Sequence, residues 1–157
     1  MKEALLILLG FVLAQLPQWI DRRRRLRTHW SAVRAELKLC REKAETFLQD
    51  AVRSPLYRLP LLAYETSFPV LLAEGALSEA DALTMGRFFS QVQDINRGLD
   101  NTTALLNVGD ESGQCREYNR NILKAKKLVE SSDGDPSLYA LARNIVDAKI
   151  AQSWWKY

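Results

Sequence analysis

The sequence predicts an all-α protein, in which an N-terminal transmembrane helix continues into a cytoplasmic antiparallel bundle of four to five helices. Two observations support this prediction. A run without any charged residue, from Ala4 to Ile20, is followed by Asp21 and then by five arginines within residues 22–27. Downstream, apolar residues recur at helical spacing and only 7 glycines interrupt the chain of 157 residues. We therefore divide the chain into a membrane-anchor helix (residues 1–21), a basic juxtamembrane run (22–27) and a helical bundle domain (28–157).

The first segment has the composition of a membrane anchor. A dense apolar block from Leu5 to Leu13 precedes a more polar stretch, residues 15–20. At 1.5 Å per residue the uncharged run spans roughly 25 Å, short of the ~30 Å hydrocarbon core. Because the run is short, a helix buried in the bundle core is the main alternative. A cleaved signal peptide and an interfacial helix fit less well, since the run lacks a basic leader and a polar face.

The charges on either side of the run predict its orientation. Only Lys2 precedes the run, whereas the arginines follow it. Because the positive side stays in the cytoplasm, we expect a single pass with the N-terminus outside and the body inside. We expect the membrane interface, in contact with anionic headgroups, to be formed by Trp19, Arg22, Arg23, Arg24, Arg25 and Arg27.

The net charge of +3 is local to the N-terminus. Residues 1–34 contain seven basic and two acidic side chains, and the remainder contains fifteen basic and seventeen acidic ones. The body is therefore slightly acidic, which argues against a nucleic-acid partner.

No residue pattern commits the chain to a chemistry. The only histidine, His29, has no metal ligand at the usual spacing, and neither a phosphate loop nor a G-x-S-x-G motif occurs. Cys40 and Cys115 lack a CxxC context, so we expect both to be small buried residues, with a disulfide only in an oxidising compartment. We expect no enzymatic activity, no metal and no cofactor.

A heptad pattern follows the arginines and predicts one helix from the membrane to about Val52, ended by Pro55. Two partners fit the pattern, a second copy of the chain and the interior of its own bundle, and bulky Trp30 and Phe47 favour the bundle. The seam residues are Leu26, Trp30, Val33, Leu37, Cys40, Ala44, Phe47 and Ala51.

Four further helices are expected. The first starts near Leu61, is kinked or divided at Pro69, and ends at Gly75 as C-cap. Ser78 is expected to cap a long helix from Glu79 to about Leu106. Its apolar stripe should face the heptad seam through Met85, Phe89, Val92 and Leu99.

After a loop at residues 107–113, a fourth helix should bury Cys115, Tyr118, Ile122, Ala125 and Val129. Asp135 as N-cap and Pro136 as first helical residue should begin the last helix. Its apolar positions are Leu138, Leu141, Ile145, Ala148, Gln152 and Trp155.

The polar residues Asp94, Arg97 and Asn101 share one face of the long helix and are a possible partner face. An exposed helix face with local ion pairs explains the same pattern. Asn96 interrupts the apolar stripe and fits a hydrogen-bonded core residue or register device better than a site residue.

The chain resembles a family of bacterial proteins of unknown activity that have an N-terminal apolar helix, an arginine run and a helical body. The resemblance is carried by residues 39–41, 54–60, 64–65, 67–69, 75–78 and 91–100. It implies a bacterial protein anchored in the inner membrane, and it assigns no functional residue.

These observations favour a membrane-tethered interaction or scaffold protein that presents its bundle to a cytosolic partner or to another copy of itself. One alternative is a soluble or peripheral protein whose buried first helix inserts into lipid, as in pore-forming or regulatory factors. A helical enzyme with an unrecognised site is the other.

Overall fold

The protein is all-α, as the sequence predicts. The computed structural model describes residues 2–50, 57–132 and 134–152, except the side chains of 1–9, 11–14 and 50. Apart from a single bridge between Ser132 and Asp135, these residues form helices and their connections. The helices are α1 (Lys2–Asp50), α2 (Leu62–Thr66), α3 (Phe68–Ala73), α4 (Glu79–Asn107), α5 (Glu111–Val129) and α6 (Leu138–Gln152).

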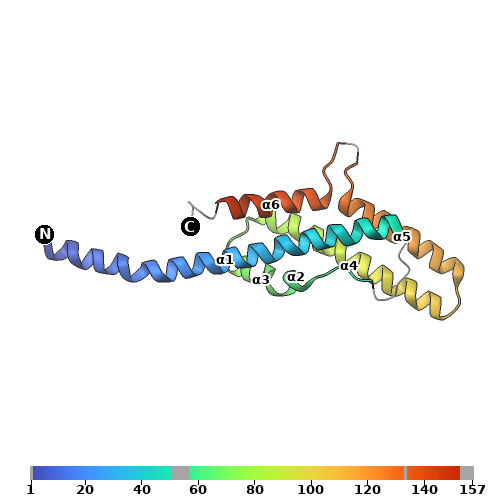
Figure 1. Ribbon diagram of the computed structural model, residues 1–157, viewed down its shortest axis with the longest axis horizontal. Helices are drawn as coiled ribbons and strands as arrows, with labels where there is room; N and C mark the ends of the chain where they lie inside the picture. Colours follow the sequence, from blue (N-terminus) through green and yellow to red (C-terminus); the bar gives the residue numbers. More distant parts are fainter. Residues whose placement is uncertain (1, 51–56, 133, 153–157) are drawn as a thin grey trace.

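The helices run in two opposite directions (Figure 1). Helices α1 and α4 run one way, whereas α5 and α6 follow one another in the other direction. Two ion pairs connect helices that run in opposite directions. Arg34 of α1 lies 3.0 Å from Asp147 of α6, and Lys149 of α6 lies 3.0 Å from Asp81 of α4. The bundle is therefore antiparallel, although two of its helices, α2 and α3, are only five and six residues long.

The heptad seam of α1 lies in the core of this chain. Every seam residue from Leu26 to Phe47 is buried, while Ala51 and Pro55 lie outside the described residues. Phe47 packs edge-on against Tyr118 of α5, with ring centroids 5.6 Å apart. The seam is thus covered from within the chain, as expected for an internal bundle.

The expected neighbour of the seam was wrong. The helix backbones that approach α1 most extensively are α5 and α6, while α4 packs chiefly on α5 and α6. The physical reason is the segment from Tyr57 to Glu74, which runs back along α1 and separates much of it from α4. Tyr64 and Phe68 of this segment pack on Phe89 of α4, at ring distances of 4.6 and 6.0 Å.

Side chains of α1 and α4 hold the backbone of this returning segment. Glu36, only 5% exposed, accepts hydrogen bonds from the N–H groups of Ala63 and Tyr64 at 2.5 and 3.0 Å. Its carboxylate therefore caps the N-terminus of α2, where the residue at the N-cap provides no side-chain hydrogen bond. Asn96 of α4 accepts from the N–H of Leu59 at 2.8 Å and donates to its carbonyl at 2.9 Å, which confirms it as a hydrogen-bonded structural residue.

The helix ends and caps between residues 67 and 78 agree closely with the sequence prediction. The helix expected from Leu61 is divided in two at Ser67, with Pro69 in the first turn of α3. Gly75 has φ +65°, and the N–H groups of Gly75 and Ala76 return to carbonyls of α3. Ser78 and Asp81 form a reciprocal capping box that begins α4.

Helix α5 differs from the prediction in where it begins and in which residues it buries. Helix α5 begins at Glu111 instead of after residue 113, because Asp110 accepts a hydrogen bond from the N–H of Gly113 at 2.9 Å and caps it. Cys115 is exposed, contrary to expectation. The residues that α5 buries are Gly113, Asn121, Ala125 and Leu128.

Helix α6 is also offset from its expected start. It begins at Leu138 with Ser137, not Asp135, as the capping side chain: the Ser137 hydroxyl accepts from the N–H of Ala140 at 3.2 Å. Asp135 instead pairs through its backbone with Ser132. Of the expected apolar positions, Trp155 lies outside the described residues and Leu141 is 38% exposed. The buried residues are Tyr139, Ala142 and Val146.

The N-terminal arm, residues 2–21 of α1, extends away from the bundle (Figure 1). Its described side chains, residue 10 and residues 15–21, are all exposed, so this part of the run does not pack into the bundle core. Pro17 lies inside the helix and removes one backbone hydrogen bond there. Within the described part of the chain, no helix meets the length and apolarity required to cross a bilayer.

Candidate functional site

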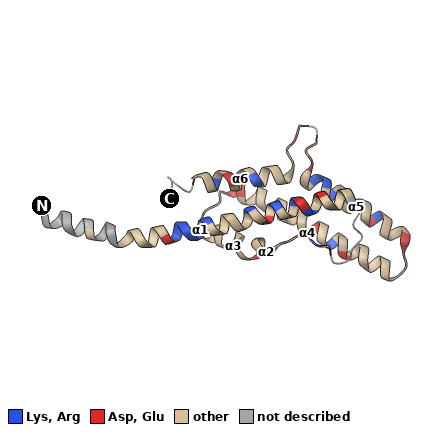
Figure 2. Cartoon of the chain, viewed as in Figure 1, with Lys and Arg blue, Asp and Glu red and all other residues tan. Residues whose placement is uncertain are grey.

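The junction between the arm and the bundle gathers most of the residues expected at the membrane interface. Figure 2 shows a stretch of α1 coloured for Lys and Arg at the point where the arm leaves the bundle. Arg22 holds this junction together: its Nε lies 2.7 Å from Oε2 of Glu74, and its Nη2 donates to the Glu74 carbonyl at 3.2 Å. Glu74 ends α3, so the arginine ties the arm to the second element of the returning segment.

Trp19 and Arg23 form a stacked pair one turn before the bundle. The guanidinium carbon of Arg23 lies 3.4 Å from the centre of the Trp19 ring, a cation–π geometry. The pair borders a small hollow of about 130 Å³ whose wall is completed by Arg22, Leu26, Glu74 and Ala76.

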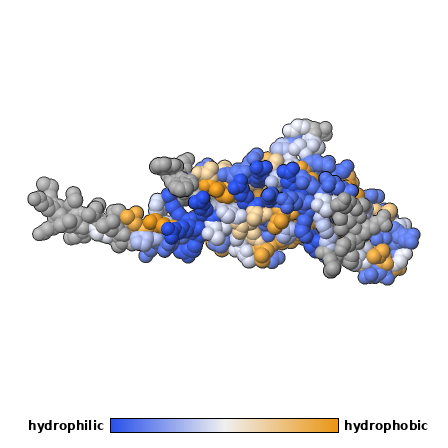
Figure 3. Space-filling view, viewed as in Figure 1, coloured by the Kyte–Doolittle hydropathy of each residue, from blue (hydrophilic) through white to orange (hydrophobic). Residues whose placement is uncertain are grey.

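The remaining arginines of the run face solvent. Arg24, Arg25 and Arg27 are exposed, beside the apolar surface of the arm, which Figure 3 shows in orange next to a blue region. His29 lies one turn further on and contacts Oγ of Ser67 through Nδ1 at 3.1 Å. The junction thus places an apolar arm, an interfacial tryptophan and exposed positive charge in sequence along one helix.

The predicted partner face on α4 is a locally paired surface. Arg97 lies 3.6 Å from Asp94, and the backbone carbonyl of Asp94 accepts a hydrogen bond from Lys124 at 3.1 Å. Asn101 is exposed on the next turn. These contacts match the alternative explanation given above, an exposed face with local ion pairs.

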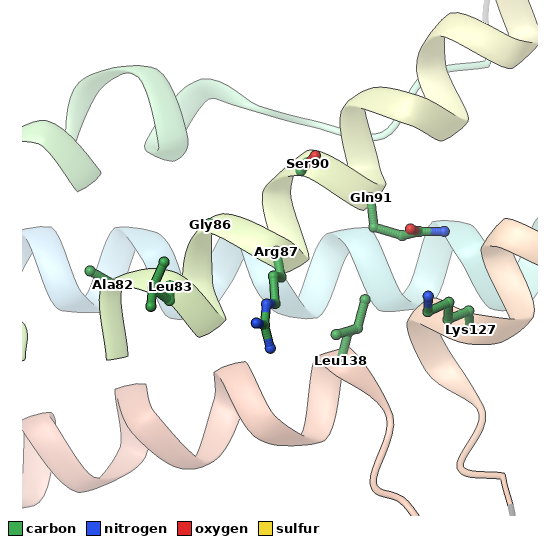
Figure 4. Close-up of a pocket in the computed structure, with 8 residues that line it drawn as sticks. All are labelled: Ala82, Leu83, Gly86, Arg87, Ser90, Gln91, Lys127 and Leu138. Carbon is green, nitrogen blue, oxygen red and sulfur yellow. The ribbon is translucent and has the colours of Figure 1, made fainter. Parts of the chain in front are cut away.

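A groove that the sequence analysis missed lies nearer the start of α4, toward α5 and α6 (Figure 4). It has a volume of about 480 Å³. The signal in the sequence is the four-residue spacing of Ala82, Gly86 and Ser90, which leaves one face of the helix without bulky side chains. The lining residues are Ala82, Leu83, Gly86, Arg87, Ser90, Gln91, Lys127 and Leu138.

The two cysteines differ in environment. Burial raises the pKa of the Cys40 thiol, with Glu36 adding to the shift, and the thiol donates to the Pro60 carbonyl at 3.3 Å. Cys115 is exposed on α5, and both thiols are free. Among the residues described, no three His, Cys, Asp or Glu side chains lie together as a metal site would require.

Comparison of the chain with protein-family models, with curated proteins and with solved structures finds no match. The resemblance to a bacterial family therefore stays an expectation from the sequence.

Proposed function

We propose that this chain is a membrane-tethered helical interaction protein, attached by its arm to the bacterial inner membrane and presenting its bundle to the cytoplasm. One observation carries the proposal: the arm leaves the bundle with apolar side chains exposed. Leu16, Trp19 and Ile20 are 41%, 44% and 42% exposed. Apolar side chains that find no packing partner in the chain gain free energy by entering lipid.

The order of residues along α1 supports the same proposal. The run from Ala4 to Ile20 has no charge, Trp19 stands at its end, and the exposed arginines follow. The run is somewhat short for a bilayer, a mismatch that local thinning and snorkelling arginines accommodate at modest cost. Through Arg22 and Glu74 the bundle is tied to this end of the arm, so attachment would hold the bundle close to anionic headgroups.

The proposal gives the bundle a binding role in place of a catalytic one. The polar side chains that the core buries, such as Glu36, hold backbone groups of neighbouring segments. The surface groove on α4 offers a contact area for a protein partner. Self-association through the same bundle is the second way in which a tethered scaffold acts.

Membrane fractionation of the full-length protein tests the tether. We expect it to remain in the membrane pellet after carbonate extraction. The variant Leu8→Asp/Leu9→Asp should move to the soluble fraction, because each charge at the centre of a spanning helix costs roughly 3 kcal/mol. Leu39→Asp is the matched control, since Leu39 is 48% exposed on the bundle part of α1.

The fractions distinguish the alternatives. Release of the wild-type protein by carbonate would favour a peripheral protein that inserts its first helix only partly. Absence from the membrane fraction altogether would overturn the tether. A reporter fused after Tyr157 tests orientation: we expect it to act in the cytoplasm, and replacing the five arginines by glutamine should mix the topology.

A further inference from the structure

We propose that the groove on α4 binds an acidic amphipathic helix of a partner protein. The inference rests on the proposed function, because it names the surface and the partner class of the tethered bundle. It is carried by three properties of the groove: an open floor, exposed apolar walls and unpaired positive charge.

The floor of the groove is not filled by this chain. A Cβ atom placed on Gly86 would meet no atom within 4 Å. Ala82 and Ser90, one turn before and after Gly86, are the only other floor positions of α4 and have small side chains. A partner helix can therefore approach the backbone of α4 closely, as small residues allow at helix contacts.

The walls of the groove are apolar and accessible. Leu83 on α4 is 56% exposed, and Leu138 on α6 lies further along the groove, near Gln91 and Lys127 (Figure 4). On the same helix as Leu138, Leu141 is 38% exposed in the adjoining hollow. Two separated leucine contacts fit the apolar stripe of an amphipathic helix, whose anchors recur every three or four residues.

The positive charges of the groove favour a partner with acidic side chains. Arg87 and Lys127 border the groove from α4 and α5, and none of its eight lining residues is acidic. Most arginines of the bundle, such as Arg34 and Arg58, are paired with carboxylates, whereas neither Arg87 nor Lys127 has a described partner. Figure 4 shows both side chains extending from their helices into the space between α4 and the start of α6.

The N-terminus of α6 adds to the positive electrostatic potential of the groove. Leu138, the first residue of α6, lines the groove, and the N-terminus of a helix carries partial positive charge. The nearest acidic side chains of α4, Asp81 and Asp94, flank the groove and are paired with Lys149 and Arg97. Glu130 and Asp135 line the adjoining hollow. Carboxylates on the flanks of a partner helix would therefore meet Arg87 and Lys127 while its apolar face meets the leucines.

Nucleic acid and lipid fit the groove less well. No aromatic side chain lines it, so bases have no surface on which to stack. Two cations are few for a phosphate backbone, which is usually bound by many. A lipid surface is flat, whereas this site is a groove between helices.

Fluorescence anisotropy tests the inference with a synthetic peptide and the full-length protein. The protein is held in nanodiscs of zwitterionic lipid, or kept in buffer if the arm does not insert. The probe is a labelled 18-residue peptide with leucines at helical spacing and glutamates on both flanks. A scrambled peptide of the same composition and a version with lysine in place of glutamate are the control probes.

We expect the acidic amphipathic peptide to bind and the two control peptides to bind at least about tenfold more weakly. Arg87→Glu and Lys127→Glu should each weaken binding about tenfold or more, since each replaces an attraction by a repulsion. Gly86→Leu should also weaken it by filling the floor. Arg143→Glu is the matched control, because Arg143 is an exposed arginine of α6 that lines a separate hollow on the α1 side of the bundle.

Several outcomes would overturn the inference. Absence of binding by the acidic amphipathic peptide, equal binding of the scrambled peptide, or equal losses in Arg143→Glu and Arg87→Glu would each do so. A second copy of the chain is the other candidate occupant, and sedimentation of the protein without peptide tests it. A dimer that Gly86→Leu abolishes would show that a second copy fills the groove instead. None of these results depends on the carbonate test of the tether.

Discussion

At the scale of single residues, the buried polar groups of this protein mostly serve backbone that would otherwise lack partners. Glu36 caps α2 from a different helix, and Asn96 satisfies both backbone groups of Leu59. The sequence predicts that Asn96 is hydrogen-bonded but names neither its partner nor the role of Glu36, because each partner lies more than twenty residues away. Asn121 differs: it is fully buried against Gly98, and neither of its amide atoms has a described hydrogen-bond partner.

Glu36→Ala should lower the free energy of unfolding by roughly 1–3 kcal/mol, because two buried N–H groups lose a charged acceptor. Urea titration of the purified protein measures the change. Glu42→Ala is the control: Glu42 is exposed with Lys38 3.7 Å away, so its loss should change stability by about 0.5 kcal/mol or less. Equal effects of the two substitutions would contradict the capping role of Glu36.

The two thiols should react at very different rates. Cys40 is buried and its pKa is raised, so little reactive thiolate is present at neutral pH, whereas Cys115 is exposed. We expect a thiol reagent such as DTNB to label one cysteine in the native protein and two after denaturation. Cys115→Ser should remove the native reaction, and rapid labelling of that variant would show that α1 opens readily around Cys40.

At the scale of the elements, the sequence signals that proved accurate are local ones. The capping box of Ser78 and Asp81 and the C-cap at Gly75 depend on neighbouring residues, and both are confirmed. The stripe of α1 was right because a long seven-residue pattern fixes one face without ambiguity. The predicted stripe of α5 was partly right: Ala125 is buried, and Tyr118, Ile122 and Val129 pack at the edge of the core. In α6 the buried residues lie one position after the predicted ones, because apolar residues at adjacent positions allow more than one apolar face.

The candidate sites were harder to predict than the elements. The groove depends on the start of α6 coming to lie near Gln91 of α4 and Lys127 of α5, a meeting of distant segments that no spacing in the sequence reveals. The polar face of Asp94 and Arg97, in contrast, stood out by composition and is an ordinary ion-paired surface.

The seam of α1 gives a direct test at this scale. Leu37→Ala should lower the free energy of unfolding by about 2–5 kcal/mol and Phe47→Ala by about 3–5 kcal/mol, because both side chains are 1% exposed. Leu39→Ala removes the same side chain as Leu37→Ala at a 48% exposed position and should cost about 0.5 kcal/mol or less. The losses should not depend on protein concentration; a dependence would assign the seam to a dimer.

At the scale of the whole molecule, the single helix α1 has one part outside the bundle and another part inside its core. The arm of α1 leaves the bundle, while the part of α1 beyond the arginines supplies a large share of the core. Arg22 and Glu74 mark the boundary between the two parts, since theirs is the ion pair nearest the arm among those that the described residues of α1 make with other helices. The bundle should therefore tolerate loss of the arm, provided that the cut lies before this contact.

Two truncated chains locate that boundary. A chain that begins at Asp21 keeps Arg22 and Leu26, so in the same mild detergent its free energy of unfolding should match that of the full chain within about 0.5 kcal/mol. A chain that begins at Thr28 loses the Arg22–Glu74 contact and the buried side chain of Leu26, which is 8% exposed. It should be less stable by roughly 2 kcal/mol, the value of one buried leucine. Guanidinium titrations followed by circular dichroism at 222 nm, the usual helix signal, measure both differences. A large loss in the chain that begins at Asp21 would mean that the arm folds back onto the bundle in solution, and would favour a buried first helix that inserts only when it meets lipid.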